Sequence, residues 1–357
     1  MEKVYVDFHV IQTVPPSCLN RDDTGSPKTA VYGGVKRARV SSQAWKHAMR
    51  MMFREYFDES QLGIRTKKII DRVADEITAK DPSLSKERSI ELAEKIINTA
   101  NVKYKYGEEK TLFFMGKKQA ENLADLVLGN PDATKKEAQA ALNEGHGVDI
   151  ALFGRMVADD PSLNAEASAQ VAHSISTHKV ENEYDYFTAA DDCSAEDNAG
   201  AGMLGTVEFN SSTLYRYATV AAHELFNQLG RDKGALAKAV SEFARAFITS
   251  MPTGKQNTFA NRTLPDAVMV TIRNDQPVNL VGAFEEPVKG EGFAKKSILK
   301  LTDYAMLVYG DYCGFPVKSF VIGDGLSAMG DKTDLKGLIE ALGKSAADMC
   351  CPDGDQK

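Results

Sequence analysis

One segment near the N-terminus has the residue types that bind phosphate groups. Between Thr24 and Arg54 the chain carries no acidic residue and seven basic ones, which are Lys28, Lys36, Arg37, Arg39, Lys46, Arg50 and Arg54. The other 36 of the 43 basic residues share the rest of the chain with all 50 acidic residues. A positive stripe in an acidic protein is expected where one face binds a polyanion.

A helix is predicted within this stripe, over residues 42–57, because apolar residues recur there three and four positions apart. Ser41 or Ser42 can cap its first turn. The electropositive end of the helix could then hold a phosphate beside the side chain of Gln43.

The same predicted helix has a basic edge. Lys46 and Arg50 lie one turn apart, with His47 next to them, and this spacing matches contacts with successive phosphates of a nucleic acid. A capped surface helix with a solvated charged face explains the pattern equally well, so both interpretations stay open at this point.

Two loops offer further polar groups for a phosphate or a sugar. One is PPSCLNRDDTGSPK, residues 15–28, and the other is GKQNT, residues 254–258. Their candidate side chains are Asn20, Arg21, Lys28, Lys255 and Gln256. Both segments also have the composition of ordinary loops.

A glycine-rich segment, residues 200–205, matches the pattern G-x-G-x-x-G. A dinucleotide site needs a buried strand before this pattern and a helix after it, and the sequence predicts neither. We expect instead the tip of a β-hairpin, with Met203 and Leu204 as exposed apolar side chains. Such a side chain could wedge between bases or pack on another subunit.

No metal or cofactor site is indicated by residue spacing. The five cysteines contain no Cys-x-x-Cys pair, and the segment around His173 and His178 lacks the glutamate of zinc hydrolases. Asp22 and Asp23 form an acidic pair in the first loop, where solvated turns are the usual role of such residues.

Composition and periodicity favour a globular α+β protein. The chain has 357 residues, 43% of them hydrophobic and 26% charged, with no signal-peptide pattern and no apolar run long enough to span a membrane, so we expect a cytoplasmic location. We predict strands over 3–12, 206–220 and 267–273, a helix near 233–250, and mainly helical structure over 61–145.

Eight segments together resemble one known family. They are PSCLNRDD, YGGVKRARVSSQAWKHAMR, GVDIALFGRM, HSISTHKV, DYFTAADD, LGTVEF, YRYA and GKQNT. In order and spacing this set is similar to the type I-E CRISPR backbone protein Cas7, also called CasC or Cse4. The resemblance implies an RRM-like (ferredoxin-like) palm, a helical fingers insertion and a thumb β-hairpin. The segments expected from it are 1–57 (palm), 58–146 (fingers), 147–180 (palm), 181–211 (thumb) and 212–357 (palm).

The resemblance also implies a function without catalysis. Members of this family assemble side by side along a CRISPR RNA in the Cascade surveillance complex and kink the RNA at regular intervals. We therefore expect the partners to be CRISPR RNA, a target DNA strand, further copies of this chain, and Cascade subunits of the Cas5, Cas6, Cas8 and Cas11 types. No cofactor and no membrane is expected.

The family pattern places RNA contacts at particular positions of this chain. Ser41, Gln43, Lys46 and Arg50 match positions that hold the guide backbone, and Asn20 and Arg21 match another contact. Met156 and Leu204 match apolar residues set against the displaced base, and Phe187 matches a thumb aromatic. Val35, His47 and Tyr186 differ from the residues frequent in the family. The full predicted RNA-binding set is Asn20, Arg21, Lys28, Lys36, Arg37, Arg39, Ser41, Ser42, Gln43, Lys46, His47, Arg50, Met156, Phe187, Leu204, Lys255 and Gln256.

An endoribonuclease is the alternative hypothesis. Backbone subunits of type III complexes have a similar plan and cut target RNA with a loop aspartate, and Asp22 or Asp23 could take that role here. A nucleotide-binding enzyme that uses the glycine-rich segment is a more distant third hypothesis.

Overall fold

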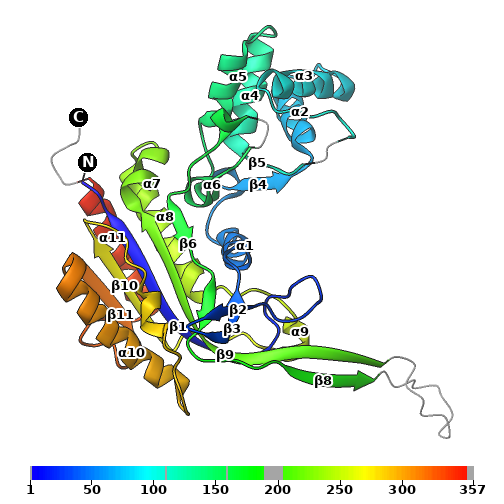
Figure 1. Ribbon diagram of the computed structural model, residues 1–357. Helices are drawn as coiled ribbons and strands as arrows, with labels where there is room; N and C mark the ends of the chain where they lie inside the picture. Colours follow the sequence, from blue (N-terminus) through cyan, green and yellow to red (C-terminus); the bar gives the residue numbers. More distant parts are fainter. Residues whose placement is uncertain (1, 109–110, 158–159, 189–203, 352–357) are drawn as a thin grey trace, which may run out of the picture.

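The computed structural model of the chain describes residues 2–108, 111–157, 160–188 and 204–351. Figure 1 shows three parts: a large twisted sheet with helices packed on it, a separate body of helices above α1, and a long hairpin that projects from the sheet. This is a mixed α/β protein, as the sequence predicts.

The sheet has β1 near its centre. Its strands follow the order β12-β11-β10-β1-β9-β7-β3-β2, and β6 and β8 also pair with β9. Their bounds are β1 Tyr5–Ser17, β2 Thr29–Tyr32, β3 Val35–Val40, β6 Ala169–Val171, β7 Ser174–Ser176, β8 Glu183–Thr188, β9 Leu204–Ala221, β10 Ala267–Arg273, β11 Lys318–Ile322 and β12 Asp331–Lys332. All pairs are antiparallel except β11 with β12. The RRM-like assignment of this sheet stays a prediction.

Alternate side chains of β1 enter two different hydrophobic clusters. Val6, Phe8 and Val10 face the first, and Ile11 lies in the second. The first cluster is covered by α1 Ser42–Phe53, α7 Ala222–Gln228, α8 Lys233–Thr249 and α11 Leu335–Cys350, and the second by α10 Phe293–Val308 and the short 3-10 helix Leu280–Phe284. Burial of one large apolar side chain such as Phe8 contributes roughly 1.5–3 kcal/mol to folding.

One predicted strand boundary was wrong. β1 continues to Ser17, beyond the expected end near residue 12, because Gln12, Thr13 and Val14 pair with β9. The register shifts only between Val14 and Ser17, where two prolines cannot donate to the ladder. The segment that holds His173 and His178 contains two short strands, β6 and β7, and no helix.

The helical body extends along the chain from β4 Gly63–Thr66 to the end of α5, and it has its own hydrophobic cluster. It contains α2 Ile69–Lys80, α3 Lys86–Thr99, β5 Phe113–Gly116, α4 Lys117–Gly129 and α5 Lys135–Asn143. The two-stranded β4–β5 ribbon escaped the sequence analysis because each strand has only four residues. α6 Val148–Phe153 leads back towards the sheet.

The predicted hairpin is formed by β8 and the first part of β9, which pair from Glu183 opposite Phe209 to Thr188 opposite Leu204. Every side chain of β8 is exposed. The glycine-rich segment up to Met203 lies outside the described residues. The five segment boundaries given above stay predictions.

Polar side chains of β1 are buried under α10. One carboxylate oxygen of Asp7 accepts from the hydroxyl of Tyr217 at 3.0 Å, and the other accepts from the backbone N–H of Val278 at 2.8 Å. Burial raises the pKa of Asp7 to about 6 and lowers the pKa of His9 to about 3. Asp7 in the folded protein therefore stays protonated to a higher pH than an exposed aspartate and ionises as pH rises through about 6.

The pKa of Asp7 predicts a pH-dependent stability. Because the folded-state pKa is above the unfolded value, this carboxyl stabilises the protein below about pH 4, and that stability is lost as pH rises through 6. Urea unfolding of Asp7→Asn should show its free energy of unfolding rising relative to wild type by up to about 3 kcal/mol between pH 4 and 7. Asp311→Asn, an exposed control, should show no such trend, and a flat difference for Asp7→Asn would contradict the prediction.

Candidate nucleic-acid interface

Helix α1 begins at a serine cap that is tied to the first loop. The side chain of Ser41 accepts from the backbone N–H of Ala44 at 3.3 Å, and the backbone N–H of Ser41 donates to the side-chain oxygen of Asn20 at 2.9 Å. Ser41 is buried, whereas Gln43 is exposed. The cap and the first loop are therefore one hydrogen-bonded unit.

The helix is shorter than expected and ends at Phe53. Phe57 turns back and packs its ring edge-on against Phe53, with 5.7 Å between the ring centres. The apolar spacing that predicted a helix to residue 57 thus arises from a turn that buries Phe57, while Tyr56 stays exposed.

A buried arginine holds α1 from below. The guanidinium carbon of Arg216 lies 3.7 Å from the centre of the Trp45 ring and 4.7 Å from that of Phe247. The indole N–H of Trp45 donates to the hydroxyl of Ser174 at 2.9 Å. Burial lowers the pKa of Arg216 to about 9. Nothing in the local sequence around Arg216 indicates this burial.

Arg37 is a correction to the predicted RNA-binding set. It is fully buried, and it donates to the backbone carbonyls of Tyr32, Ser176 and Phe284 at 3.1, 3.0 and 2.8 Å. These bonds fix the β2–β3 hairpin. We therefore withdraw Arg37 as an RNA contact.

The glycines between β2 and β3 form a turn. Gly33 has φ +57°, and a Cβ atom there would lie 1.7 Å from the carbonyl oxygen of Glu285. Glycine at position 33 thus permits a close approach to the protein's own backbone.

Arg50 is a second correction. Its Nε lies 3.0 Å from a carboxylate oxygen of Asp149, and the two side chains are only 11% and 3% exposed. Its guanidinium also lies over the Phe114 ring at 4.3 Å. Burial raises the pKa of Asp149, although Arg50 opposes the rise. Arg50 thus joins α1 to the helical body, and we withdraw it as a phosphate contact.

Other predicted cations remain accessible. Arg21 and Lys36 are exposed, and Lys28 and Lys46 are half-buried. The amine of Lys46 lies 5.8 Å from the centre of the Phe153 ring, and burial together with Arg65 lowers its pKa.

Arg39 is partly engaged within the protein. It donates to the carbonyl of Thr29 at 3.2 Å and lies 3.1 Å from a ring nitrogen of His173.

Asp22 closes the first loop on itself. Its carboxylate accepts from the backbone N–H groups of Thr24 and Ser26, both at 3.0 Å, and from the Thr24 hydroxyl at 2.7 Å. These bonds hold the pKa of Asp22 below the ordinary value, and the bond from the Thr24 hydroxyl has the largest effect. Asp23 is exposed. Among the described residues, no group of three histidine, cysteine or acidic side chains is arranged to hold a metal ion.

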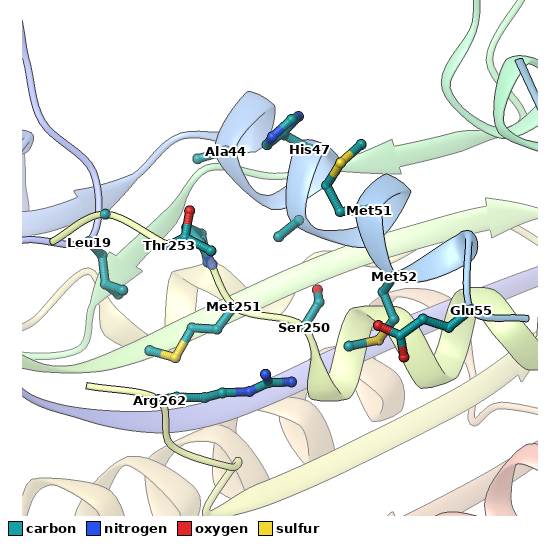
Figure 2. Close-up of a pocket in the computed structure, with 13 residues that line it drawn as sticks. Leu19, Ala44, His47, Met51, Met52, Glu55, Ser250, Met251, Thr253 and Arg262 are labelled. Atoms are coloured by element: carbon teal, nitrogen blue, oxygen red, sulfur yellow. The ribbon is translucent and has the colours of Figure 1, made fainter. Parts of the chain in front are cut away.

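Leu19 lines three neighbouring hollows, and residues predicted to contact RNA line each of them. One is lined by Asn20, Lys28 and Arg39, and a second of ≈ 540 Å³ by residues 19–25 and Gly254. The third, of ≈ 440 Å³, lies between α1 and the chain after α8; it includes His47 and is shown in Figure 2. The first loop, α1 and the GKQNT segment therefore form one surface.

The GKQNT segment is held close to the first loop. A Cβ atom on Gly254 would lie 2.1 Å from the carbonyl oxygen of Leu19, so only glycine fits. Lys255 and Ala260, at φ 50° and 45°, bracket the short helix α9 Gln256–Phe259. Such backbone strain in non-glycine residues is concentrated at functional sites.

The remaining predicted residues lie elsewhere. Met156, after α6, is 87% exposed. Phe187 lies on the projecting hairpin (Figure 1), and Leu204 begins β9 opposite Thr188. Sequence reasoning missed two exposed cations: Arg262 at the third hollow, and Arg65, whose guanidinium lies 5.1 Å from the Phe114 ring centre.

Comparison with known proteins places the chain in a family. A family model described as CT1975-like protein (Cas_CT1975) matches residues 6–344. The chain belongs to this family. The prediction of a Cas7-like family of CRISPR Cascade subunits is confirmed at this level, whereas the type I-E assignment stays a prediction.

This CT1975-like chain is also similar to solved structures. One is a chain of a "CRISPR RNA-guided surveillance complex, pre-nicking", with 31% identity, a TM-score of 0.83, and coverage of 96% of this chain and 100% of that one. Another, from a "CRISPR RNA-guided surveillance complex", has 30% identity, a TM-score of 0.62, and coverage of 94% and 99%. No curated protein matches the chain. In its described part, no helix has the length and apolarity needed to cross a membrane.

Proposed function

We propose that this protein is the CRISPR RNA-binding backbone subunit of a type I-E Cascade surveillance complex and has no catalytic residue. Copies bind side by side along the guide RNA, kink it at regular intervals and present it to a target DNA strand. Base pairing then reads the sequence, while the protein neutralises the RNA backbone. The other partners are Cascade subunits of the Cas5, Cas6, Cas8 and Cas11 types.

One observation carries this proposal. In a chain that is similar to a subunit of an RNA-guided surveillance complex, the acid-free stripe forms one surface with the first loop and the GKQNT segment. Arg21, Lys28, Lys36 and Lys46 are accessible cations that lie in the first loop or between it and the middle of α1. We assign them the phosphate contacts, together with the exposed polar groups of Gln43 and Gln256.

The hairpin supports an arrangement in several copies. Tyr184 and Tyr186 are 70% and 65% exposed, and Phe187 is 39% exposed. The hairpin projects away from the helical body (Figure 1). Exposed aromatic side chains on a projecting hairpin fit contacts with RNA or with a neighbouring copy.

The proposal predicts a salt-dependent loss of RNA affinity. Replacement of both Lys36 and Lys46 by alanine should weaken binding to two unrelated single-stranded RNAs by the same factor. It should also reduce the slope of log affinity against log salt by about 0.7 for each phosphate that the variant no longer neutralises. Equilibrium binding at several salt concentrations measures both quantities.

A control with the same change of charge is available on α11, where Lys336 and Lys344 are exposed. Their joint replacement by alanine removes the same net charge and should leave the slope unchanged. Loss of affinity for only one of the two RNAs would contradict backbone recognition.

A further inference from the structure

The hollow beneath α1, called here the α1 groove, has a composition that phosphate contacts do not explain. Its walls include Leu19, Ala44, Ala48, Met51, Met52 and Met251. Its volume of ≈ 440 Å³ falls within the range of roughly 300–1,000 Å³ typical of small-ligand sites. We propose that the α1 groove binds one nucleobase of the bound RNA strand. This inference rests on the function proposed above.

A buried hydroxyl group in the groove lacks a partner. Ser250 is 3% exposed, and its hydroxyl makes no hydrogen bond with the protein. Figure 2 shows this side chain pointing towards α1, from the floor of the groove. Buried polar groups normally find partners. The ring nitrogens and exocyclic groups of a nucleobase edge can supply a hydrogen-bond partner for this hydroxyl, whereas an aliphatic side chain cannot.

The rim of the groove also suits a base rather than a phosphate. His47, Glu55 and Arg262 are exposed around it. Imidazole can stack on a base, and a guanidinium and a carboxylate can pair with its acceptors and donors. The carboxylate of Glu55 would repel a phosphate, and the methionine walls are apolar. Flexible methionine side chains adapt to bases of different size, as a guide of arbitrary sequence requires.

The position on α1 connects the groove to the phosphate-binding edge. Successive helix residues are rotated by about 100°, so Lys46 and His47 face adjacent directions. Ala44, His47, Ala48 and Met51 line the groove. A nucleotide whose phosphate contacts Lys46 can therefore direct its base onto the groove side of the helix.

The test compares a 12-nucleotide oligouridylate with an abasic ribose-phosphate chain of the same length. Wild type should bind oligouridylate about 10-fold more tightly. Ala48→Phe, which fills the groove, should reduce this preference to less than about 3-fold, with unchanged affinity for the abasic chain and an unchanged salt slope. Ser250→Ala, a smaller change, should also lower the preference. Ala294→Phe, on α10, is the matched control.

The outcomes separate this inference from the proposed function. Suppose that Lys36→Ala with Lys46→Ala lowers the affinity for both probes, but that Ala48→Phe and Ser250→Ala leave the preference for oligouridylate over the abasic chain unchanged. The groove proposal is then overturned, and the proposed function stands. If wild type binds neither probe, the proposed function fails, and the groove proposal fails with it. If Ala48→Phe instead reduces self-association by sedimentation, without a change in base preference, the groove holds a side chain of another copy and the proposal is wrong.

Discussion

Replacement of Arg37 by alanine should lower the free energy of unfolding by at least about 3 kcal/mol, measured by urea denaturation without RNA. The guanidinium is fully buried and donates to backbone carbonyls from three separate segments. Removal leaves these acceptors unpaired in the interior, and each unpaired buried group costs about 1–3 kcal/mol.

The neighbouring residue Lys36 provides the control, because it is exposed on the same strand. Lys36→Ala should change stability by less than about 0.5 kcal/mol. Arg37→Lys should recover only part of the loss, because one ammonium cannot reproduce the planar fork of donors. An Arg37→Ala protein of normal stability with weakened RNA binding would restore the original prediction of a phosphate contact.

The second large effect concerns Arg50. Arg50→Ala should destabilise the protein by about 3–5 kcal/mol, because it leaves the carboxylate of Asp149 buried without its partner. Thermal or urea unfolding without RNA measures this loss. Arg54→Ala, one turn later on an exposed residue, should have little effect on stability.

A double replacement tests the reason for the loss. Arg50→Met combined with Asp149→Leu removes both charges and keeps apolar volume, so it should recover most of the stability that Arg50→Ala loses. If the double variant is as unstable as the sum of the single variants, the pair interaction is not the cause. The salt slope of RNA binding should stay unchanged in any of these variants that fold.

Features fixed by local sequence were predictable. The α1 cap, the helix near residue 240, β10 and the hairpin are each specified by residues close together in the chain, through capping and side-chain periodicity. The convergence of the first loop, α1 and the GKQNT segment was predictable only through the family resemblance, since more than 200 residues separate Asn20 from Lys255.

Which arginines of the stripe are buried could not be predicted. A count of charges places Arg37, Arg50 and Lys46 in the same stripe, but their burial depends on distant partners. The carbonyls of Ser176 and Phe284 lie 139 and 247 positions from Arg37, and Asp149 lies 99 positions from Arg50. The extension of β1 to Ser17 likewise depends on pairing with β9, which overrides the turn propensity of two adjacent prolines.

The separate hydrophobic cluster of the helical body has an evolutionary consequence. Because α2 to α5 bury their apolar faces mainly against one another, insertions, deletions and repacking there can accumulate with little strain on the sheet. Divergence among homologues should therefore concentrate in this body, while the ion pair between Arg50 and Asp149 restricts change at its attachment to α1.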